Sequence, residues 1–409
     1  MKRIVIIGGG FAGIYSVRNL LKCYKNKEEI EIVLISKNNF FLFTPLLHEV
    51  ATGGINLENI VEPIRDIIRA KNFRFIECEV KKVDLKNKVV YIKDRKINYD
   101  FLVIAIGSKD NFYNVEDAEK FCLKLKTLED ARLIKNRLIG VLEQYVKYEG
   151  QDKNLLSFII IGGGPTGVEL VGEVCDFLEQ IIKEDYKEIP LHDVNVFLIH
   201  SGKKLIPMFS EKAIIDSYNR LIKKNVKVLL NSNITKVFID GVEINNKEKI
   251  SGKTIIWTGG VTPNIIETFP KVTDKDNYFV VDKFLNVNGY RDVYAIGDCA
   301  LFYNKEDNKL VPALAQVAVD QARYVACNIK HRIGGSEEEE YYFKAKGYIL
   351  SVGQKFATGD IYWIHKKGFF TWWLWRTIYL FKLIGFRNKI RTVVDWTIGL
   401  FSKRDTTRI

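Results

Sequence analysis

The chain has 409 residues, of which 47% are hydrophobic and 27% are charged, and its net charge is +12. This length predicts about two or three domains, and the composition excludes a small disulfide scaffold, a disordered chain and a multi-span membrane protein. The six cysteines include no C-x-x-C pair and no metal-ligand spacing, so we expect reduced thiols and no bound metal. The first residues show no signal-peptide pattern, so we expect a protein that is not exported.

A strand-like run, Ile4 to Ile7, opens the chain and leads into Gly8-Gly9-Gly10-Phe11-Ala12-Gly13, which has the spacing G-x-G-x-x-G. A helical pattern and a second strand-like run, Glu31 to Ile35, follow. In this context the three glycines have separate uses. The first makes a tight turn, the second lets the backbone approach a pyrophosphate, and the third lets the helix pack closely on the strand.

The same pattern occurs a second time. The run Phe158 to Ile161 leads into Gly162-Gly163-Gly164-Pro165-Thr166-Gly167, and the strand-like run Val194 to Ile199 follows. One glycine fingerprint is weak evidence, but two in this context predict two dinucleotide sites, each with a pyrophosphate at a helix N-terminus. The chemistry that connects two dinucleotides is hydride transfer between a nicotinamide and a flavin.

Later segments carry a resemblance. The run Ala295-Ile296-Gly297-Asp298 places a carboxylate at a strand end, where it suits a ribitol hydroxyl. Together with the runs at 103–107 and 255–260, it resembles the two-dinucleotide-binding flavoprotein superfamily. The resemblance implies non-covalent FAD at the first fingerprint and NADH or NADPH at the second.

The segment from Phe40 to Gly53 has no cysteine, whereas disulfide reductases of this superfamily carry a redox cysteine pair there. It resembles instead the type II NADH:quinone oxidoreductases, which are single-subunit enzymes that do not pump protons. The runs at 315–318, 368–372, 387–388 and 395–396 are also similar to that family. The resemblance covers essentially the whole chain and implies electron transfer from NADH or NADPH through FAD to a membrane quinone.

The resemblance also implies a set of contacts. For FAD they are Gly8, Gly9, Gly10, Phe11, Ala12, Gly13, Ser36, Lys37, Val80, Ala105, Gly107, Asp298, Ala315, Gln316 and Arg376. For the nicotinamide nucleotide they are Gly162, Gly164, Pro165, Thr166, Gly167, His200 and Gly260. A quinone site is implied at Thr44, Pro45, Gln316 and Asp320. For Arg376 the alternative is a guanidinium that reaches a lipid phosphate.

Three positions depart from the family pattern. Ser36 and His200 stand where an acidic residue usually binds the adenosine ribose. The serine weakens one FAD hydrogen bond, and the histidine, followed by Lys203 and Lys204, leaves NADPH open as the donor. The third departure is in the quinone motif, which has Asp320 at its last position and a glutamine one residue further on.

Glu169 is the candidate catalytic acid or base, because the family places a glutamate where nicotinamide and flavin meet. The alternative is a capping box with Thr166, in which the glutamate only satisfies a backbone amide at the start of a helix. We interpret His48 as structural.

The C-terminal segment is basic and aromatic. From Lys366 onward there are ten Lys or Arg and two Asp, and five of the six tryptophans lie at or beyond Trp363. Arg376 and Lys382 interrupt the apolar run, which predicts amphipathic helices lying on anionic lipid rather than a spanning helix. We therefore expect a peripheral (monotopic) protein at the cytoplasmic face of the cell membrane that does not bind nucleic acid. The alternatives are core helices or a dimer contact. The glutamate run 337–340 is interpreted as a solvated loop.

The predicted architecture is α/β, with two Rossmann-like dinucleotide-binding domains, the second inserted in the first, and an amphipathic helical membrane anchor. Residues 1–112 and 278–330 would bind FAD, 113–277 would bind NAD(P)H, and 331–409 would provide the anchor and quinone access. The resemblance implies a homodimer. Two other functions stay open: a sulfide:quinone oxidoreductase, for which Cys122 is the suggestive cysteine, and a membrane-docked flavoprotein that senses NAD(P)H without turnover.

Overall fold

The computed structural model describes residues 1–93, 95–306, 308–345, 347–362 and 364–408, so Trp363 lies outside the described residues. The chain divides into two compact units. The first consists of Met1–Leu42, Val61–Lys109 and Val261–Lys344, and the second of Phe43–Ile60, Asp110–Gly260 and Ala345–Ile409. In sequence, the second unit interrupts the first.

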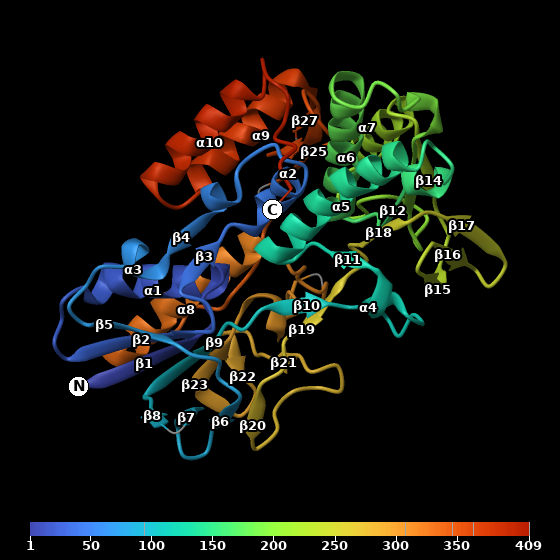
Figure 1. Cartoon of the computed structure of the whole chain (residues 1–409). Coiled ribbons are helices and arrows are strands. Elements are labelled where there is room, and N and C mark those ends of the chain that lie inside the picture. The colour runs from blue at the N-terminus through green and yellow to red at the C-terminus, as the bar shows by residue number, and fades with distance from the viewer. Residues whose placement is uncertain (94, 307, 346, 363, 409) are drawn as a thin grey trace. The chain divides into compact units, whose positions relative to one another are not determined.

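The first unit is built on a six-stranded sheet in the order β22-β23-β9-β1-β2-β5. Every neighbouring pair is parallel except β22 with β23, which is antiparallel. The strands are β1 (Lys2–Ile7), β2 (Ile30–Ser36), β5 (Phe73–Glu77), β9 (Phe101–Ile104), β22 (Asn286–Val287) and β23 (Tyr290–Ala295). Helices α1 (Phe11–Tyr24) and α8 (Ala315–Gly334) lie side by side (Figure 1). The central strand β1 is a continuous apolar run from residue 4 to 7, all buried, which is typical of a parallel sheet covered on both faces.

Smaller elements complete this unit. The strands β6 (Lys82–Asp84), β7 (Val89–Ile92) and β8 (Arg95–Asn98) form an antiparallel meander, to which β20 (Glu267–Phe269) adds in parallel. The others are β3 (Phe40–Leu42), β4 (Val61–Pro63), α3 (Ile64–Ile67), β19 (Val261–Pro263), β21 (Phe279–Val280), η5 (Gly297–Cys299) and β24 (Ala300–Leu301). Strand β10 (Ser108–Asp110) spans the boundary between the two units.

The second unit contains a five-stranded sheet in the order β11-β18-β12-β13-β14, in which all pairs are parallel. Its strands are β11 (Leu123–Lys124), β12 (Ser157–Ile161), β13 (Asn195–Ile199), β14 (Val226–Leu229) and β18 (Thr254–Trp257). Its long helices are α5 (Leu128–Lys147), α6 (Pro165–Glu184) and α7 (Glu211–Lys223). A separate antiparallel sheet consists of β15 (Ile234–Phe238), β16 (Gly241–Ile244) and β17 (Glu248–Ser251). The short helices are α4 (Ala118–Phe121), η3 (Lys153–Leu156) and η4 (Leu191–Asp193).

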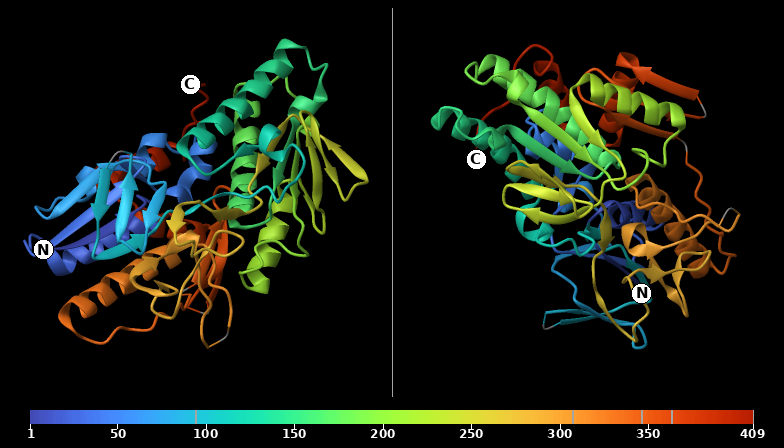
Figure 2. Two further views of the ribbon diagram at one scale, coloured as in Figure 1. Left: turned by 90° about the horizontal axis from the view of Figure 1, so that it is seen from below. Right: turned by 90° about the vertical axis from the view of Figure 1, so that its right-hand side faces the viewer.

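The C-terminal part of this unit begins with three antiparallel strands, β25 (Gly347–Ser351), β26 (Ala357–Ile361) and β27 (Ile364–Gly368). Two helices follow, α9 (Phe369–Lys382) and α10 (Phe386–Ile398). The red helices of Figure 2 lie beside these strands, and α9 packs on them. Strand β25 also contacts α6, and strand β26 also contacts α7. At Gly172 on α6, a Cβ would lie 2.5 Å from the backbone nitrogen of Gly353, so this helix and the β25–β26 turn approach as closely as backbones allow.

The segment 43–60 belongs to the second unit, although the predicted boundaries count it with residues 1–112. It contains η1 (Thr44–Leu46), α2 (Leu47–Ala51) and η2 (Leu57–Ile60). Helix α2 packs against α5 and α6, which explains why the segment belongs to the second unit. Among the helices that the structure describes, none has both the length and the apolar character needed to cross a bilayer.

Candidate functional site

The first glycine turn has the backbone that its sequence requires. Gly8 has a φ of +112°, and a Cβ there would lie 2.1 Å from the carbonyl oxygen of Ala105. A Cβ at Gly13 would lie 1.8 Å from the carbonyl oxygen of Gly8. Gly10 is the N-cap of α1, and a Cβ there would meet no atom of the described residues within 4 Å. The amides at the start of α1 therefore face open space, with no acidic residue in the first turn to repel an anion.

Polar groups of the first unit surround this turn. Ser36 is buried at the end of β2, and its hydroxyl oxygen accepts from the backbone N–H of Asn38 at 3.3 Å. The Ser108 hydroxyl donates to the Asp298 carboxylate at 2.6 Å. Gln321 accepts from the backbone N–H of Gly297 at 2.7 Å, so the glutamine displaced by one position in the quinone motif positions the loop beside Asp298.

The other predicted FAD contacts of this unit lie in several elements. Phe11 and Ala12 open α1, Ala315 and Gln316 open α8, Lys37 is exposed after β2, and Val80 and Ala105 are buried. Asp320 lies on α8, where its carboxylate accepts from Arg323 at 3.3 Å. The predicted quinone residues are thus divided between the units. Thr44 and Pro45 belong to the second, and Gln316 and Asp320 to the first.

The second glycine turn repeats the first. Gly162 has a φ of +116°, and a Cβ at Gly167 would lie 1.9 Å from the carbonyl oxygen of Gly162. Gly164 is the N-cap of α6, with open space at its Cβ position and Pro165 in the first turn. The first turn of α6 also has no acidic residue, so this helix start suits a pyrophosphate.

His200, at the end of β13, closes one side of the second turn. Its Nδ1 accepts from the backbone N–H of Gly163 at 3.2 Å, and burial lowers the pKa of its imidazole. Lys204 forms an ion pair with Glu211. A neutral imidazole beside an already paired lysine adds little charge with which to select a 2′-phosphate.

Glu169 lies on α6, and the capping-box alternative is wrong. The helix begins at Pro165 with Gly164 as N-cap, so Thr166 is inside the first turn and cannot cap it. The Glu169 carboxylate accepts instead from the backbone N–H of Ser351 on β25, at 3.4 Å. Burial raises the pKa of Glu169 to about 7, and the repulsion of neighbouring carboxylates adds to this, while His48 and the Ser351 N–H act in the opposite direction.

Arg376 on α9 is mostly buried, with 15% of its side chain exposed, and it lies against Glu49 and two indole rings. Its guanidinium carbon lies 3.9 Å from the ring centroid of Trp372 and 4.8 Å from that of Trp396. Its Nη2 is 4.0 Å from the carboxylate of Glu49 on α2, and that carboxylate also accepts from the indole N–H of Trp396 at 2.6 Å. The two C-terminal helices and the distant helix α2 therefore meet around one buried carboxylate.

A second buried ion pair lies on the same helix as Glu169. Glu173 is one turn further along α6, and its carboxylate accepts from the guanidinium of Arg404 at 2.5 Å. The two side chains are only 4% and 3% exposed. Arg404 also donates to the carbonyl oxygen of Thr52, at 3.3 Å, which connects the C-terminal tail to the segment after α2.

His48, interpreted from the sequence as structural, is part of this cluster. His48 is buried, its ring lies 5.9 Å from that of Trp375, and its Nε2 has no hydrogen-bond partner among the residues that the structure describes. A cavity of about 310 Å³ lies next to these groups, with Glu49, Glu173, Trp372, Arg376, Trp396 and Arg404 in its wall. The four-residue spacing of Glu169 and Glu173 could have indicated one helix face, but nothing local indicates Glu49 or Arg404.

Cys122, the cysteine considered for a sulfide:quinone oxidoreductase, lies in apolar surroundings. It lies in an apolar cluster of the second unit with Ile159, Ile255 and Trp257, and burial raises the pKa of its thiol to about 12. A thiol of this kind stays protonated and unreactive at neutral pH. All six cysteines, each within the described ranges, are free.

Comparison with known proteins agrees with this geometry. A model of the pyridine nucleotide-disulphide oxidoreductase family matches residues 2–322, so the chain belongs to that family. A model of the NDH2 C-terminal domain matches residues 346–405. A type II NADH:quinone oxidoreductase of Mycobacterium tuberculosis, NdhA, is 28% identical over 98% of this chain and 87% of its own length. A probable NADH dehydrogenase of Dictyostelium discoideum is 28% identical over 99% and 90%.

Solved structures show the same fold. The structure of NDH2 from Plasmodium falciparum in complex with NADH superposes with a TM-score of 0.90 at 23% identity, covering 99% of both chains. The sulfide:quinone oxidoreductase of Aquifex aeolicus superposes less well, with a TM-score of 0.76 at 21% identity over 98% and 96%. Within its family the chain is thus a member of the type II NADH:quinone oxidoreductases, as the resemblance implied.

Proposed function

We propose that this protein transfers hydride from NADH to non-covalently bound FAD and passes two electrons to a membrane quinone without pumping protons. One observation carries the proposal. Helix α6 starts at an open glycine turn and bears, five residues further on, a buried carboxylate whose pKa is about 7. At 1.5 Å per residue, Glu169 lies about 7.5 Å along the helix from the turn. A nucleotide site and a group that exchanges protons at neutral pH therefore belong to one rigid element.

The first unit fits FAD. The open amides after Gly10 suit a pyrophosphate, and Asp298, oriented by Ser108, suits ribitol hydroxyls. FAD supplies the redox chemistry when bound, because its ring takes up a hydride and returns the two electrons to a quinone. The predicted contacts of Ser36, Val80 and the start of α8 agree with their position in this unit.

The second unit fits the nicotinamide nucleotide. Gly162, Gly164 and Gly167 form its turn, and His200 holds the turn through the N–H of Gly163. We propose NADH as the donor in preference to NADPH, because Lys204 already forms an ion pair with Glu211. Initial rates with the two nucleotides at equal concentration test this, and faster turnover with NADPH would contradict it.

Proton supply is the task of Glu169 in this proposal. Reducing a quinone to a quinol adds two electrons and two protons. A group with a pKa near the working pH can both hold and release a proton, so Glu169 serves as acid or base. His48 is a buried neighbour that lowers the pKa of Glu169, and its Nε2 has no hydrogen-bond partner within the described chain. The quinone contacts proposed in the second unit are Thr44 and Pro45. Those proposed in the first unit are Gln316 and Asp320, on α8.

The exposed side of α9 and α10 is proposed to lie on anionic lipid at the cytoplasmic face of the membrane. Five aromatic side chains of this region are 59% to 87% exposed: Phe370, Trp373, Phe381, Phe386 and Phe401. The other side of α9 is buried, with Trp372 and Trp375 in the interior. Aromatic side chains among basic residues favour the headgroup region of anionic bilayers. Co-sedimentation with vesicles that contain phosphatidylserine should fall for Phe370→Ser/Phe381→Ser and stay unchanged for Ile239→Ser, an equally exposed apolar residue elsewhere.

The predicted domain roles fit this scheme. We propose FAD binding by residues 1–112 and 278–330, a Rossmann-like nucleotide domain at 113–277 inserted between them, and membrane and quinone access by 331–409. A homodimer, with equivalent membrane faces, is proposed as well.

Anaerobic titration tests the function. Adding NADH to the purified flavoprotein should bleach the flavin absorbance, and a quinone should then restore it rapidly. A reduced flavin that persists after quinone favours the sensor, and bleaching by sulfide alone favours the sulfide oxidoreductase. The variant Glu169→Gln should retain FAD and NADH bleaching but slow the reoxidation by quinone. Unchanged reoxidation would remove Glu169 from the mechanism.

A further inference from the structure

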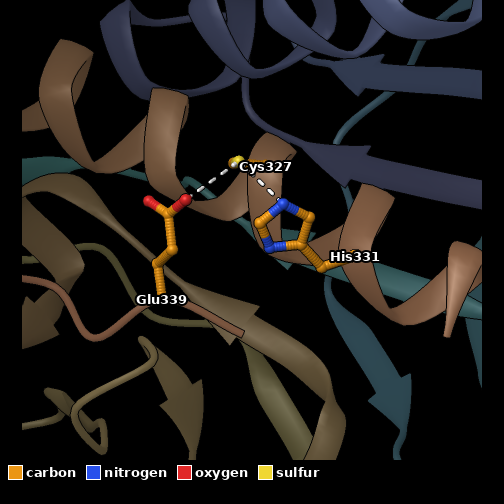
Figure 3. Close-up of side chains that lie close together, drawn as sticks. All are labelled: Cys327, His331 and Glu339. Atoms are coloured by element: carbon orange, nitrogen blue, oxygen red, sulfur yellow. Dashed lines mark hydrogen bonds between the residues drawn. The ribbon is translucent and has the colours of Figure 1, made fainter. Parts of the chain in front are cut away.

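Three side chains of different chemistry converge near the end of α8. Cys327 and His331 are four residues apart on this helix and so share one face, and Glu339 comes from the loop that follows it. Figure 3 shows the three side chains pointing toward one another. The Cys327 sulfur is 3.6 Å from the His331 Nε2 and 3.9 Å from a Glu339 carboxylate oxygen. The ligand atoms all lie within 4.8 Å of one another.

The distances from the Cys327 sulfur to its two neighbours are close to those of a tetrahedral cation site. Zinc binds cysteine sulfur at about 2.3 Å and histidine nitrogen at about 2.0 to 2.1 Å. At a tetrahedral angle, such bonds place the sulfur and nitrogen about 3.6 Å apart. The observed sulfur–nitrogen distance is therefore that of two ligands on one ion, and the sulfur–oxygen distance exceeds its expected value by only a few tenths of an ångström.

The backbone around Glu339 is held independently of these side chains. Asn328, the residue after Cys327, is fully buried and donates to the carbonyl oxygen of Glu339 at 2.9 Å. It also accepts from the N–H of Glu339 at 2.8 Å. The backbone N–H and the carbonyl oxygen of Glu339 are thus both hydrogen-bonded to α8, at the residue that follows Cys327. This clamp explains why a carboxylate that belongs to a loop lies over the helix, and it supplies the support that metal ligands require.

The glutamate run is therefore more than a solvated loop. Glu340 forms an ion pair with Lys283, and Glu338 accepts from the Tyr294 hydroxyl at 3.3 Å. Glu339 is the member of this run that has the Cys327 thiol as a neighbour.

We propose that Cys327, His331 and Glu339 form a structural site for a divalent cation of the zinc class. Sulfur and imidazole ligands favour such an ion over calcium or magnesium, which prefer oxygen. Binding deprotonates the thiol, and the proton leaves to solvent. The fourth ligand position is open to water. The site fastens the acidic loop to α8 in the first unit, and its role is independent of the reaction proposed above.

Metal analysis of the holoenzyme tests the site. Protein stripped with a chelator, reduced with a phosphine and dialysed against limiting Zn²⁺ should retain a single ion per chain. Cys327→Ser and His331→Gln should each lose it. Cys78→Ser is the matched control, because Cys78 is also a partly exposed thiol of the first unit, but its sulfur donates only to the Glu79 carbonyl oxygen.

Cobalt provides a second readout. Co²⁺ in a tetrahedral site with sulfur should give visible bands at longer wavelength than the flavin absorbs, in the parent protein and in Cys78→Ser but not in Cys327→Ser. The thermal unfolding midpoint of the parent should rise with Zn²⁺ concentration, while that of Cys327→Ser should not. Retention of Zn²⁺ by Cys327→Ser at the parent level, or no stoichiometric binding by the parent, overturns the proposal. FAD content and NADH oxidation, measured in parallel, show that each variant is folded.

Discussion

The buried pair of Arg404 and Glu173 should be a main determinant of the stability of the second unit. Replacing Arg404 by Met removes the guanidinium and leaves a carboxylate that is 4% exposed with no opposite charge at 2.5 Å. It also removes the donor to the carbonyl oxygen of Thr52. Breaking a buried pair on one side costs about 3 to 5 kcal/mol, because an uncompensated charge remains in the interior. For a domain of about 150 to 250 residues this lowers the unfolding midpoint by about 6 to 20 °C.

The neighbouring residue provides the control. Lys403 forms an ion pair with Asp185 at the same distance of 2.5 Å, but its side chain is 49% exposed. Exposed ion pairs contribute little to stability, so Lys403→Met should leave the midpoint close to that of the parent. The double variant Arg404→Met/Glu173→Met replaces both charges by apolar groups and should recover most of the loss.

Thermal unfolding followed by circular dichroism and by release of flavin fluorescence measures all four proteins. The reasoning fails if Arg404→Met melts together with Lys403→Met. It fails equally if the double variant melts as low as Arg404→Met, because the loss would then come from packing of the tail and not from the unpaired carboxylate.

Three further outcomes are expected. The pKa of Glu169 is about 7 in the folded protein against 4.5 ordinarily, so the stability that this carboxyl contributes is present below pH 4.5 and lost as pH rises to about 7. The free energies of unfolding of Glu169→Gln and the parent, measured by denaturant titration, should therefore diverge in that window in favour of the variant, by about 3 kcal/mol. A constant difference would contradict the assigned shift. Gly8→Ala should yield protein without FAD, since its Cβ would lie 2.1 Å from the Ala105 carbonyl oxygen; a normal flavin spectrum would show that the turn adapts. Gln321→Leu removes the acceptor for the Gly297 N–H and should weaken FAD retention on dilution, whereas retention equal to the parent would make that hydrogen bond dispensable.

The sequence predicts the nucleotide turns well because their requirements are local. Gly8 and Gly162 need positive φ, and the strand, turn and helix around them span only residues 2–24 and 157–184, so the sequence shows both the pattern and its physical reason. The capping-box alternative would place the N-cap of α6 two residues too late, because Thr166 has the side chain of a cap while Gly164 has the cap conformation. A cap is decided by backbone geometry, and the sequence reports it only indirectly.

The buried charged cluster around Glu49, Glu169 and Glu173, by contrast, could not be predicted from local sequence. Arg404 and Glu173 are separated by 231 residues, and Trp396 and Glu49 by 347, so no local pattern relates them. For Arg376 the sequence left a lipid-phosphate alternative open beside the FAD contact, because arginines among tryptophans are typical of membrane interfaces. Its side chain is only 15% exposed, because Glu49 and two indole rings make a site for its charge. Partners of that kind become visible only once the chain is folded.

The C-terminal segment contributes three of the groups that surround the buried carboxylates of the second unit. It supplies the Ser351 N–H to Glu169, the Arg404 guanidinium to Glu173 and the Trp396 indole to Glu49. The same segment buries these carboxylates, and burial is the main cause of the raised pKa of Glu169. If α9 and α10 make the proposed membrane contact, a change in how these helices pack should alter both that contact and the pKa of Glu169. In the proposed function, the element placed on the membrane would then also set the pKa of the group that supplies protons to the quinone.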